Sequence, residues 1–449
     1  MSSAVRWAAV AALSLPAIAA HAIDLVGAYD QALHYDPTKL AADDALVAGR
    51  EKAVQGDALL RPRVGLQAGV NRVDDHTPGS VPAAFTSIFP THSTGNVRQA
   101  TVQLVQPLYD ASARAQKQQL HQETALAETQ FQQAQQDLAQ RVAEAYFGVL
   151  LAEEALRVTE AEKTAVGMQR DRAQARFDVG RGKVTDLHET QARYDQVLTK
   201  EISARSALEL RRAQFQETTG ISAEGLAKLA AGFKAVPPEP DSLLAWQADG
   251  EDHSTLVQAK RSQLEIASAE IGKHRLAGRP TLDLVAGYTA RGQNGGLSTL
   301  SYPDRERTGV VGVQLNVPLY AGGAIDSRER ESVAARSKAE QELAAARRDV
   351  RLQVQDGYLA VKTGVSRVTS LEQALVSART ALEATSLGRD VGTRTELDVL
   401  DAQQRLYAAE FDLAQARFDY LLGRIRLAAA AGELTEADLR TLNGWLTAQ

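Results

Sequence analysis

The chain has 449 residues, of which 50 are lysine or arginine and 56 are aspartate or glutamate, and its formal net charge is −6. The slight acidic excess and the lack of a large basic block argue against a nucleic-acid-binding protein. Because the chain has no cysteine, it cannot use a cysteine nucleophile.

The first 22 residues predict a secretory signal peptide. Arg6 gives a positive start, residues 7–20 are largely apolar, and Ala20-His21-Ala22 fits a cleavage site between small residues. We therefore expect the mature chain to begin at Ile23, without a cysteine that could carry a lipid anchor. No later run of about 18 apolar residues exists, so the sequence predicts no membrane-spanning helix.

Four segments alternate between apolar residues and small or polar ones, which is the period of a β-strand. A soluble sheet with one wet face and a membrane sheet both fit this alternation. The interposed residues are small or polar rather than charged, and each segment has about the 9 to 11 residues of a tilted membrane strand, which favours the membrane. The two polar loops, Asp74 to Asn96 and Arg291 to Thr308, are too long for tight turns. We place the strands at about residues 63–71, 97–107, 281–290 and 309–318.

A long helical tract follows each strand pair, at about residues 110–179 and 324–388. Neither tract contains proline. In the tract 398–431, apolar residues recur at three- and four-residue spacing from Leu400 to Ala428, which is typical of a coiled-coil seam. Helices this polar need water on at least one face, which leaves a solid bundle, a rod and a hollow cylinder open. Shorter helical tracts are expected at residues 37–60, 186–219, 254–277 and 398–431.

The second half of the chain repeats the first after about 212 residues. Gly180 and Asp186 recur as Gly392 and Asp398, and Pro107-Leu108-Tyr109 recurs as Pro318-Leu319-Tyr320. Each copy runs from a strand pair to a long helix and a return helix. We therefore expect one body with repeats at 23–236 and 254–432, a linker at 237–253 and a C-terminal tail at 433–449.

The turns between long and return helices collect glycine and charged residues. Gly180 and Gly392 fit C-terminal helix positions, while Thr185-Asp186 and the segment from Thr395 to Asp398 fit helix N-caps. Asp398 and Asp401 share one helix face, and Asp186 and Glu189 are their counterparts in the first copy. Such a pair fits a solvated surface, a metal site or the charged lining of a narrow opening. The basic residues of the same turns are Arg181, Lys183, Arg389 and Arg394.

Catalytic constellations are missing from the sequence. The eight histidines have no metal-ligand spacing. The glycine-rich segment 321–324 lacks the lysine of a phosphate-binding loop, so we expect a strand exit with Asp326 or Ser327 capping the next helix. We predict neither an enzyme nor a bound cofactor or metal.

The duplicated order of elements, the strand exit from Pro318 to Gly323 and the run from Val391 to Ala402 resemble the TolC family of outer-membrane efflux proteins. The resemblance covers essentially the whole mature chain and implies a mixed α+β membrane protein. It implies a homotrimer in which each chain gives four strands to one transmembrane β-barrel and its helices to a coiled-coil tunnel in the periplasm.

The resemblance also implies a function: a passive exit duct in the outer membrane, in contact with its lipid, for tripartite efflux or type I secretion. A periplasmic adaptor protein and an inner-membrane ABC or proton-driven pump would open the periplasmic tip. The lack of an N-terminal cysteine favours the type I secretion branch. The alternative is a periplasmic coiled-coil scaffold without a pore, which would have no use for the four strands.

The family's motif assigns roles to residues of the two turns. Asp398 and Asp401 would form carboxylate rings at the periplasmic mouth, and Arg394 and Asp186 would contribute links that hold it shut, with Glu189 beside them. Where the family carries an aromatic tether, this chain has Arg389. The expected adaptor-docking tips are Gly180, Arg181, Gly182, Lys183, Arg389, Gly392 and Thr393.

Overall fold

The computed structural model describes residues 23–76, 85, 92–230, 232–294 and 304–447. The expected signal peptide lies outside the described residues. The described helices are α1 (Leu25–Tyr35), α2 (Pro37–Ala58), α3 (Ala111–Asp178), α4 (Val184–Thr219), α5 (Leu243–His253), α6 (Thr255–Leu276), α7 (Ala324–Asp390), α8 (Glu396–Ala431) and α9 (Glu436–Asn443). The described strands are β1 (Arg63–His76), β2 (His92–Tyr109), β3 (Lys228–Leu229), β4 (Thr281–Gln293), β5 (Arg305–Asn316) and β6 (Leu446–Thr447).

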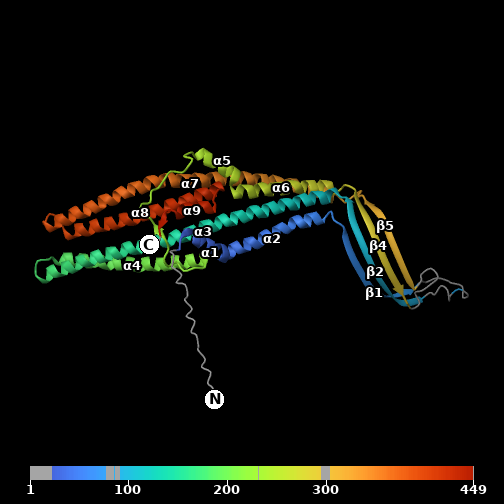
Figure 1. Cartoon of the computed structure of the whole chain (residues 1–449), viewed down its shortest axis with the longest axis horizontal. Coiled ribbons are helices and arrows are strands. Elements are labelled where there is room, and N and C mark those ends of the chain that lie inside the picture. The colour runs from blue at the N-terminus through green and yellow to red at the C-terminus, as the bar shows by residue number, and fades with distance from the viewer. Residues whose placement is uncertain (1–22, 77–84, 86–91, 231, 295–303, 448–449) are drawn as a thin grey trace, which may run out of the picture.

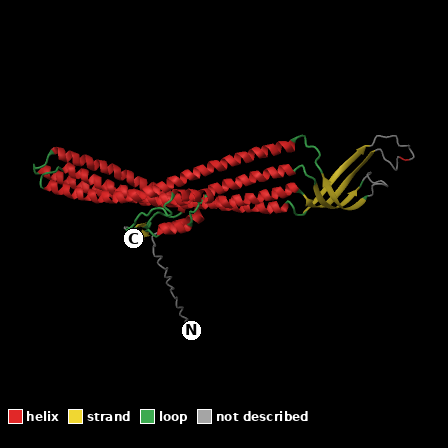
Figure 2. Cartoon of the chain, turned by 90° about the horizontal axis from the view of Figure 1, so that it is seen from above, coloured by secondary structure: helices red, strands yellow, loops and turns green. Residues whose placement is uncertain are grey.

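The molecule is a long rod with a sheet at one end and two helical turns at the other (Figure 1). The helices α3 and α7 have 68 and 67 residues and run along most of the helical part. Toward the sheet they pack with α2 and α6, and toward the far end they pack with α4 and α8. Figure 2 shows the helices running from the turns at one end, through the middle of the rod, to the sheet at the other end. We call α3–α4 the first hairpin and α7–α8 the second hairpin.

The sheet at the end of the rod is antiparallel, with strand order β1-β2-β4-β5. Side chains alternate between its faces, so residues paired across strands share a face. One face carries apolar residues such as Val64, Leu284 and Val313, and the other carries Gln67, Thr289 and similar polar residues. Val64 and Val313 are largely exposed in the single chain. In the described part of the chain, no helix is both long and apolar enough to span a membrane.

The strands reach further than the alternating pattern predicts. We expected β1 to end near residue 71 and β2 to begin near residue 97, but pairing continues to His76 opposite His92. Likewise β4 extends to Gln293, and β5 runs from Arg305 to Asn316 rather than from 309 to 318. Backbone hydrogen bonds do not depend on apolar alternation, so they carry both ladders into segments that we expected to be loop.

The middle of the rod holds the main hydrophobic core, where the short helix α1 packs against α3, α4 and the short helix α9. The buried Tyr146 hydroxyl donates to the carbonyl oxygens of Ile23 and Ala227 at 3.0 and 2.8 Å. Tyr420 of α8 likewise donates its hydroxyl to the carbonyl oxygen of Val236 at 2.8 Å. These two tyrosines fasten the chain segments outside the long helices to the rod. The short helices α1, α5 and α9 were not expected from the sequence.

The helix starts differ from expectation at two places. The helix α7 begins after Gly323, which has φ 80° and makes no side-chain cap, so neither Asp326 nor Ser327 caps it. The helix α4 begins at Val184 after Lys183, again without a side-chain cap, so Thr185-Asp186 is not the N-cap. Both chain reversals are set by glycine backbone conformation before the helix rather than by a side chain.

Candidate functional site

The candidate site is the pair of turns at the end of the rod opposite the sheet (Figure 1). Gly180 and Gly392 have φ values of 72° and 82°, which side-chain-bearing residues rarely adopt. In the first turn, the N–H groups of Arg181 and Gly182 both donate to the Arg176 carbonyl at 2.9 Å. In the second, the N–H groups of Thr393 and Arg394 donate to the Gly388 carbonyl at 2.8 and 3.2 Å. The repeated glycine therefore builds the same reversal twice.

The second return helix starts with a complete capping box. The Asp398 N–H donates to Thr395 Oγ1 at 3.1 Å, and Asp398 Oδ2 accepts from the Thr395 N–H and hydroxyl at 2.8 and 2.9 Å. These hydrogen bonds, helped by the positive charge of Arg394, hold the pKa of the Asp398 carboxyl below its usual value. Asp398 is therefore charged at neutral pH, and one of its carboxylate oxygens accepts hydrogen bonds from the turn.

Asp401 lies one helical turn further along α8 and is directed to the other hairpin. Its Oδ1 is 3.8 Å from Nη2 of Arg193 in α4, and 54% of its side chain is exposed. Arg193 also donates to Gln404 of α8. Asp398 and Asp401 thus have different partners, although they lie on one helix face.

The expected partners in the first turn remain apart from Arg394 within one chain. Asp186 lies in the first turn of α4, where its Oδ1 is 3.5 Å from the Thr185 hydroxyl. Arg394 is exposed, and among the described residues it has no ion-pair partner. Its side chain lies over Gly388, where an added Cβ would come within 2.8 Å of Arg394 Cγ. Glu189 is exposed on α4.

The sequence did not reveal the role of Glu396, which connects the two hairpins. Its Oε1 is 3.4 Å from Arg389 Nη1 in α7, and its Oε2 is 3.4 Å from Arg176 Nη1 in α3. Arg389 Nη1 also donates to the buried Gln169 of α3 at 3.3 Å. We call these four residues the Glu396 cluster. Glu396 and Arg389 are 7 positions apart across a turn, and Arg176 is 220 positions away, so no local period marks them.

The Glu396 cluster changes the position expected for Arg389. We expected this residue at an exposed docking tip, but only 8% of its side chain is exposed. Its guanidinium group donates hydrogen bonds to Glu396 and Gln169. It also donates to the neighbouring Asp390 at 2.7 Å. Arg389 therefore acts between the hairpins. The other expected tip residues are exposed or half-buried, namely Gly180, Arg181, Gly182, Lys183, Gly392 and Thr393.

Few other contacts hold the hairpins together near the tips. A small apolar cluster of Val166, Val197 and Leu400 lies between them, with Tyr194 beside it. Further toward the middle of the rod, Arg157 of α3 and Glu410 of α8 form an ion pair at 3.6 Å. Exposed ion pairs of this kind contribute about 1 kcal/mol or less each. This end of the rod is therefore much less firmly packed than the middle.

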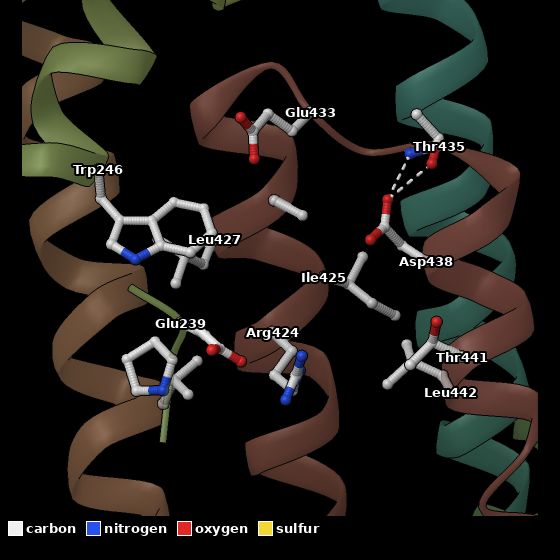
Figure 3. Close-up of a pocket in the computed structure, with 13 residues that line it drawn as sticks. Glu239, Trp246, Arg424, Ile425, Leu427, Glu433, Thr435, Asp438, Thr441 and Leu442 are labelled. Carbon is white, nitrogen blue, oxygen red and sulfur yellow. Dashed lines mark hydrogen bonds between the residues drawn. The ribbon is translucent and has the colours of Figure 1, made fainter. Parts of the chain in front are cut away.

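A cavity of about 350 Å³ lies in the middle of the rod, away from these turns (Figure 3). Trp246 of α5, Arg424 and Leu427 of α8, and Asp438 of α9 line part of it. The Asp438 carboxylate accepts from the Thr435 N–H and hydroxyl at 2.9 and 2.8 Å, so it is the N3 partner in a capping box whose N-cap is Thr435. In the described part of the chain, no group of three or more His, Asp or Glu residues is placed to hold a metal ion.

The sequence and the fold both match known outer-membrane proteins. Residues 28–220 and 251–433 match the family described as outer membrane efflux protein. The chain is 33% identical to outer membrane protein TolC of Vibrio cholerae, over 97% of each chain. It is 30% identical to alkaline protease secretion protein AprF of Pseudomonas aeruginosa, over 94% of this chain and 86% of the relative. The solved CmeC outer membrane channel of Campylobacter jejuni shares the fold, with a TM-score of 0.78 and 15% identity over 93% of this chain and 89% of that chain.

We predict that removing the Glu396 carboxylate loosens the two hairpin tips. Because the native chain has no cysteine, spin labels at Arg181→Cys and Thr393→Cys report the distance between the two tips by electron paramagnetic resonance. Glu396→Ala should broaden and lengthen this distance distribution, because both arginines lose their shared partner. Adding Arg176→Ala should change it by less than the sum of the two single effects.

Asp390→Ala is the matched control. Asp390 contacts the same Arg389 guanidinium at 2.7 Å, but it lies on the same hairpin and is exposed. The control should leave the tip distance unchanged. Equal distributions in the Glu396 variant and the native protein would show that Glu396 does not hold the hairpins together.

Proposed function

Because the chain belongs to the outer membrane efflux protein family, we propose that three copies form one exit duct, with a shared β-barrel in the outer membrane and a helical tunnel in the periplasm. The chain is an outer-membrane efflux and secretion channel protein, and its relatives are transport and secretion proteins rather than enzymes. The trimer, the closed barrel and the roles of the tip residues are the parts that we propose.

The observation that carries this proposal is the four-stranded sheet with one apolar face and two free edges. The edges are β1 and β5. About eight strands are the practical minimum for a closed barrel, so one chain cannot close it. A membrane sheet cannot leave edges unpaired in lipid, because each unpaired backbone group there costs several kcal/mol. Pairing β5 of one copy with β1 of the next satisfies both edges.

At the other end of the rod, we propose a closed mouth made of three pairs of hairpins. Asp398 and Asp401 line it as two rings of carboxylates, and Asp186 and Glu189 lie beside them on α4. Arg394, which lacks an ion-pair partner among the described residues of its own chain, reaches Asp186 of the neighbouring copy. The Glu396 cluster adds a link inside each chain, in place of the family's aromatic tether.

The proposed partners fit the same geometry. A periplasmic adaptor protein docks on the exposed tip residues Gly180, Arg181, Gly182, Lys183, Gly392 and Thr393, and an inner-membrane ABC or proton-driven pump supplies the energy. Weak links at the tips suit a mouth that a partner opens. We favour the type I secretion branch over drug efflux, supported by the relative that is named for secretion of an alkaline protease.

Our first test of this function uses introduced cysteines at the sheet edges. Leu66 of β1 and Val313 of β5 are exposed on the same face of the sheet. Within a chain these strands are separated by β2 and β4, about 14 Å at the usual strand spacing, which is too far for a disulfide. Oxidation of outer membranes carrying Leu66→Cys together with Val311→Cys, Val313→Cys or Leu315→Cys should give a covalent ladder that ends at three chains.

The Leu66→Cys variant alone is the control and should give no ladder beyond two chains. A ladder that stops at two chains for every pair, or a native protein found as a soluble periplasmic monomer, would contradict the trimeric duct.

Our second test concerns the carboxylate rings. Six carboxylates around one axis should bind multivalent cations, which should block the conductance of the protein in a planar bilayer. Asp398→Asn with Asp401→Asn should weaken the block at least tenfold, since asparagine keeps a side-chain oxygen for the cap but removes the charge. Because the pKa of Asp398 is lowered, block of the native channel should persist at pH 5.

Asp412→Asn, at an exposed position further along α8, is the matched control and should leave the block unchanged. Block of native strength in the Asp398 and Asp401 double variant would place the cation site elsewhere.

Our third test concerns closure. Several exposed ion pairs of about 1 kcal/mol or less, repeated three times, can keep the open fraction near a percent. Arg394→Ser should therefore raise single-channel conductance without loss of the trimer, whereas Arg379→Ser on the exposed side of α7 should not. Adding Asp186→Ala should raise it by less than the sum of the single effects if both residues share one contact. Native conductance in Arg394→Ser would show that closure depends on other residues.

A further inference from the structure

We propose that the lipid-facing side of the sheet carries a binding site for the phosphate groups of an outer-leaflet glycolipid, formed by Arg98, Arg305 and Arg307 with Arg72 beside them. This inference rests on the proposed function, because it requires the sheet to stand in the outer membrane with its loops outside. One end of the four-stranded sheet adjoins the helices (Figure 1), so in the proposed duct the other end, with His76 and Arg305, lies at the outer leaflet.

The strand register places these arginines on one face. Arg98 of β2 pairs with Gly292 of β4, and Gly292 pairs with Arg305 of β5. One row nearer the helices, Arg307 pairs with Ala290. Because residues paired across antiparallel strands share a face, Arg98, Arg305 and Arg307 surround the position of Gly292 on three neighbouring strands.

The same face carries the apolar band of the sheet. Val70 lies opposite Arg98, and further toward the helices the band includes Val102, Tyr288 and Val311. The arginines therefore begin where the apolar residues end, at the height of the lipid headgroups. A charged side chain costs about 2–4 kcal/mol at the middle of the bilayer but only about 0–1 kcal/mol near its surface, and arginine can extend its charge toward water.

The guanidinium groups of the site are exposed and available. These four residues pair through their backbones in the sheet, but within the described parts of the chain none of their guanidinium groups makes a hydrogen bond or an ion pair. The acidic Glu306 lies on the opposite face, in the row of Arg291. Asp74, on the same face as Arg72, is 3.6 Å from Nδ1 of His92. The site is therefore a concentration of unneutralised positive charge.

Gly292 leaves room for a ligand between the arginines. A Cβ added there would meet only the Asp304 carbonyl oxygen, at 3.8 Å. Arg98 and Arg305 stand on either side of this open position, two strand spacings or about 10 Å apart. Two arginine side chains across that span can both reach one phosphate, and the planar guanidinium group matches phosphate oxygens in bidentate fashion.

The direction of the face decides the occupant. Cargo inside the duct would meet the polar face with Arg291 and Glu306, whereas the face with Arg98 and Arg305 meets lipid. The ligand must combine an apolar part that lies along Val70, Val102 and Tyr288 with phosphate at its head. A phosphorylated glycolipid of the outer leaflet has both, and a soluble phosphate ion has only the second.

The experiment compares lipid binding to the full-length protein in detergent, using native mass spectrometry. The probes are bisphosphorylated lipid A, the same lipid after enzymatic removal of its phosphates, and inorganic phosphate. The native protein should bind lipid A at least about tenfold more tightly than the dephosphorylated lipid, given the usual contribution of each basic residue near an anionic surface. Inorganic phosphate at millimolar concentration should not displace lipid A. Equal binding of the two lipids, or displacement by phosphate, would overturn the proposal without any variant.

Two variants locate the site. The triple variant Arg98→Gln, Arg305→Gln, Arg307→Gln should lose the preference for lipid A, while Arg291→Gln, on the opposite face of the same strands, should retain it. Equal loss in both, or no loss in the triple variant, would overturn the site. Arg98→Lys keeps the positive charge but removes the planar guanidinium group, so it should weaken lipid A binding about threefold. This variant tests the site if the triple variant does not fold.

Conductance in a planar bilayer separates this inference from the duct. Loss of the lipid preference with normal conductance of the triple variant would support the site. Unchanged lipid binding with normal conductance would overturn the site and leave the duct standing. Absence of any conductance from the native protein would overturn the duct and the lipid site with it.

Discussion

The unpaired edges of β1 and β5 constrain the rest of this molecule. In water an exposed strand edge can be hydrated, but in lipid every backbone group needs a protein partner. The chain supplies an apolar face and four long strands, yet no strand in the described part of the chain pairs with the two edges. In the assembly that we propose, identical copies related by rotation provide the missing partners, because each copy offers one edge of each kind. The helices that continue from the strands must follow the same symmetry, so the assembly of the sheet also determines that of the rod.

Packing along the rod is uneven, and the unevenness suits a duct that is opened at one end. Around the middle, aromatic residues such as Tyr146, Phe215 and Tyr420 are buried and tie the short helices to the long ones. At the tips, the contacts between the hairpins are a small apolar cluster around Val166 and a few ion pairs. Local opening is easiest where few apolar contacts must be broken. In the duct that we propose, a partner that docks on the hairpins can therefore part them while the middle of the rod stays intact.

The two repeats have kept one backbone plan and changed its side chains. Gly180 and Gly392 turn the chain in the same way. However, the positions of Arg389 and Glu396 correspond to Phe177 and Val184 in the first copy, both of which are exposed. The Glu396 cluster therefore exists once per chain, with Arg176 of the first repeat as a partner. Divergence after duplication converted two equivalent turns into two unlike ones that contact each other.

The sequence by itself determined what depends on near neighbours along the chain. Apolar period, glycine and Thr395 with Asp398 were enough to predict the four strands, the long helices, the turns at Gly180 and Gly392 and one capping box. The tertiary structure alone decided what depends on distant groups. Pairing of His76 with His92 lengthened strands whose side chains no longer alternate. The burial of Arg389 and the contact between Glu396 and Arg176 depend on how two hairpins are rotated against each other, which no local period records. The short helices α1 and α9 form where the core of the rod provides apolar surface for them.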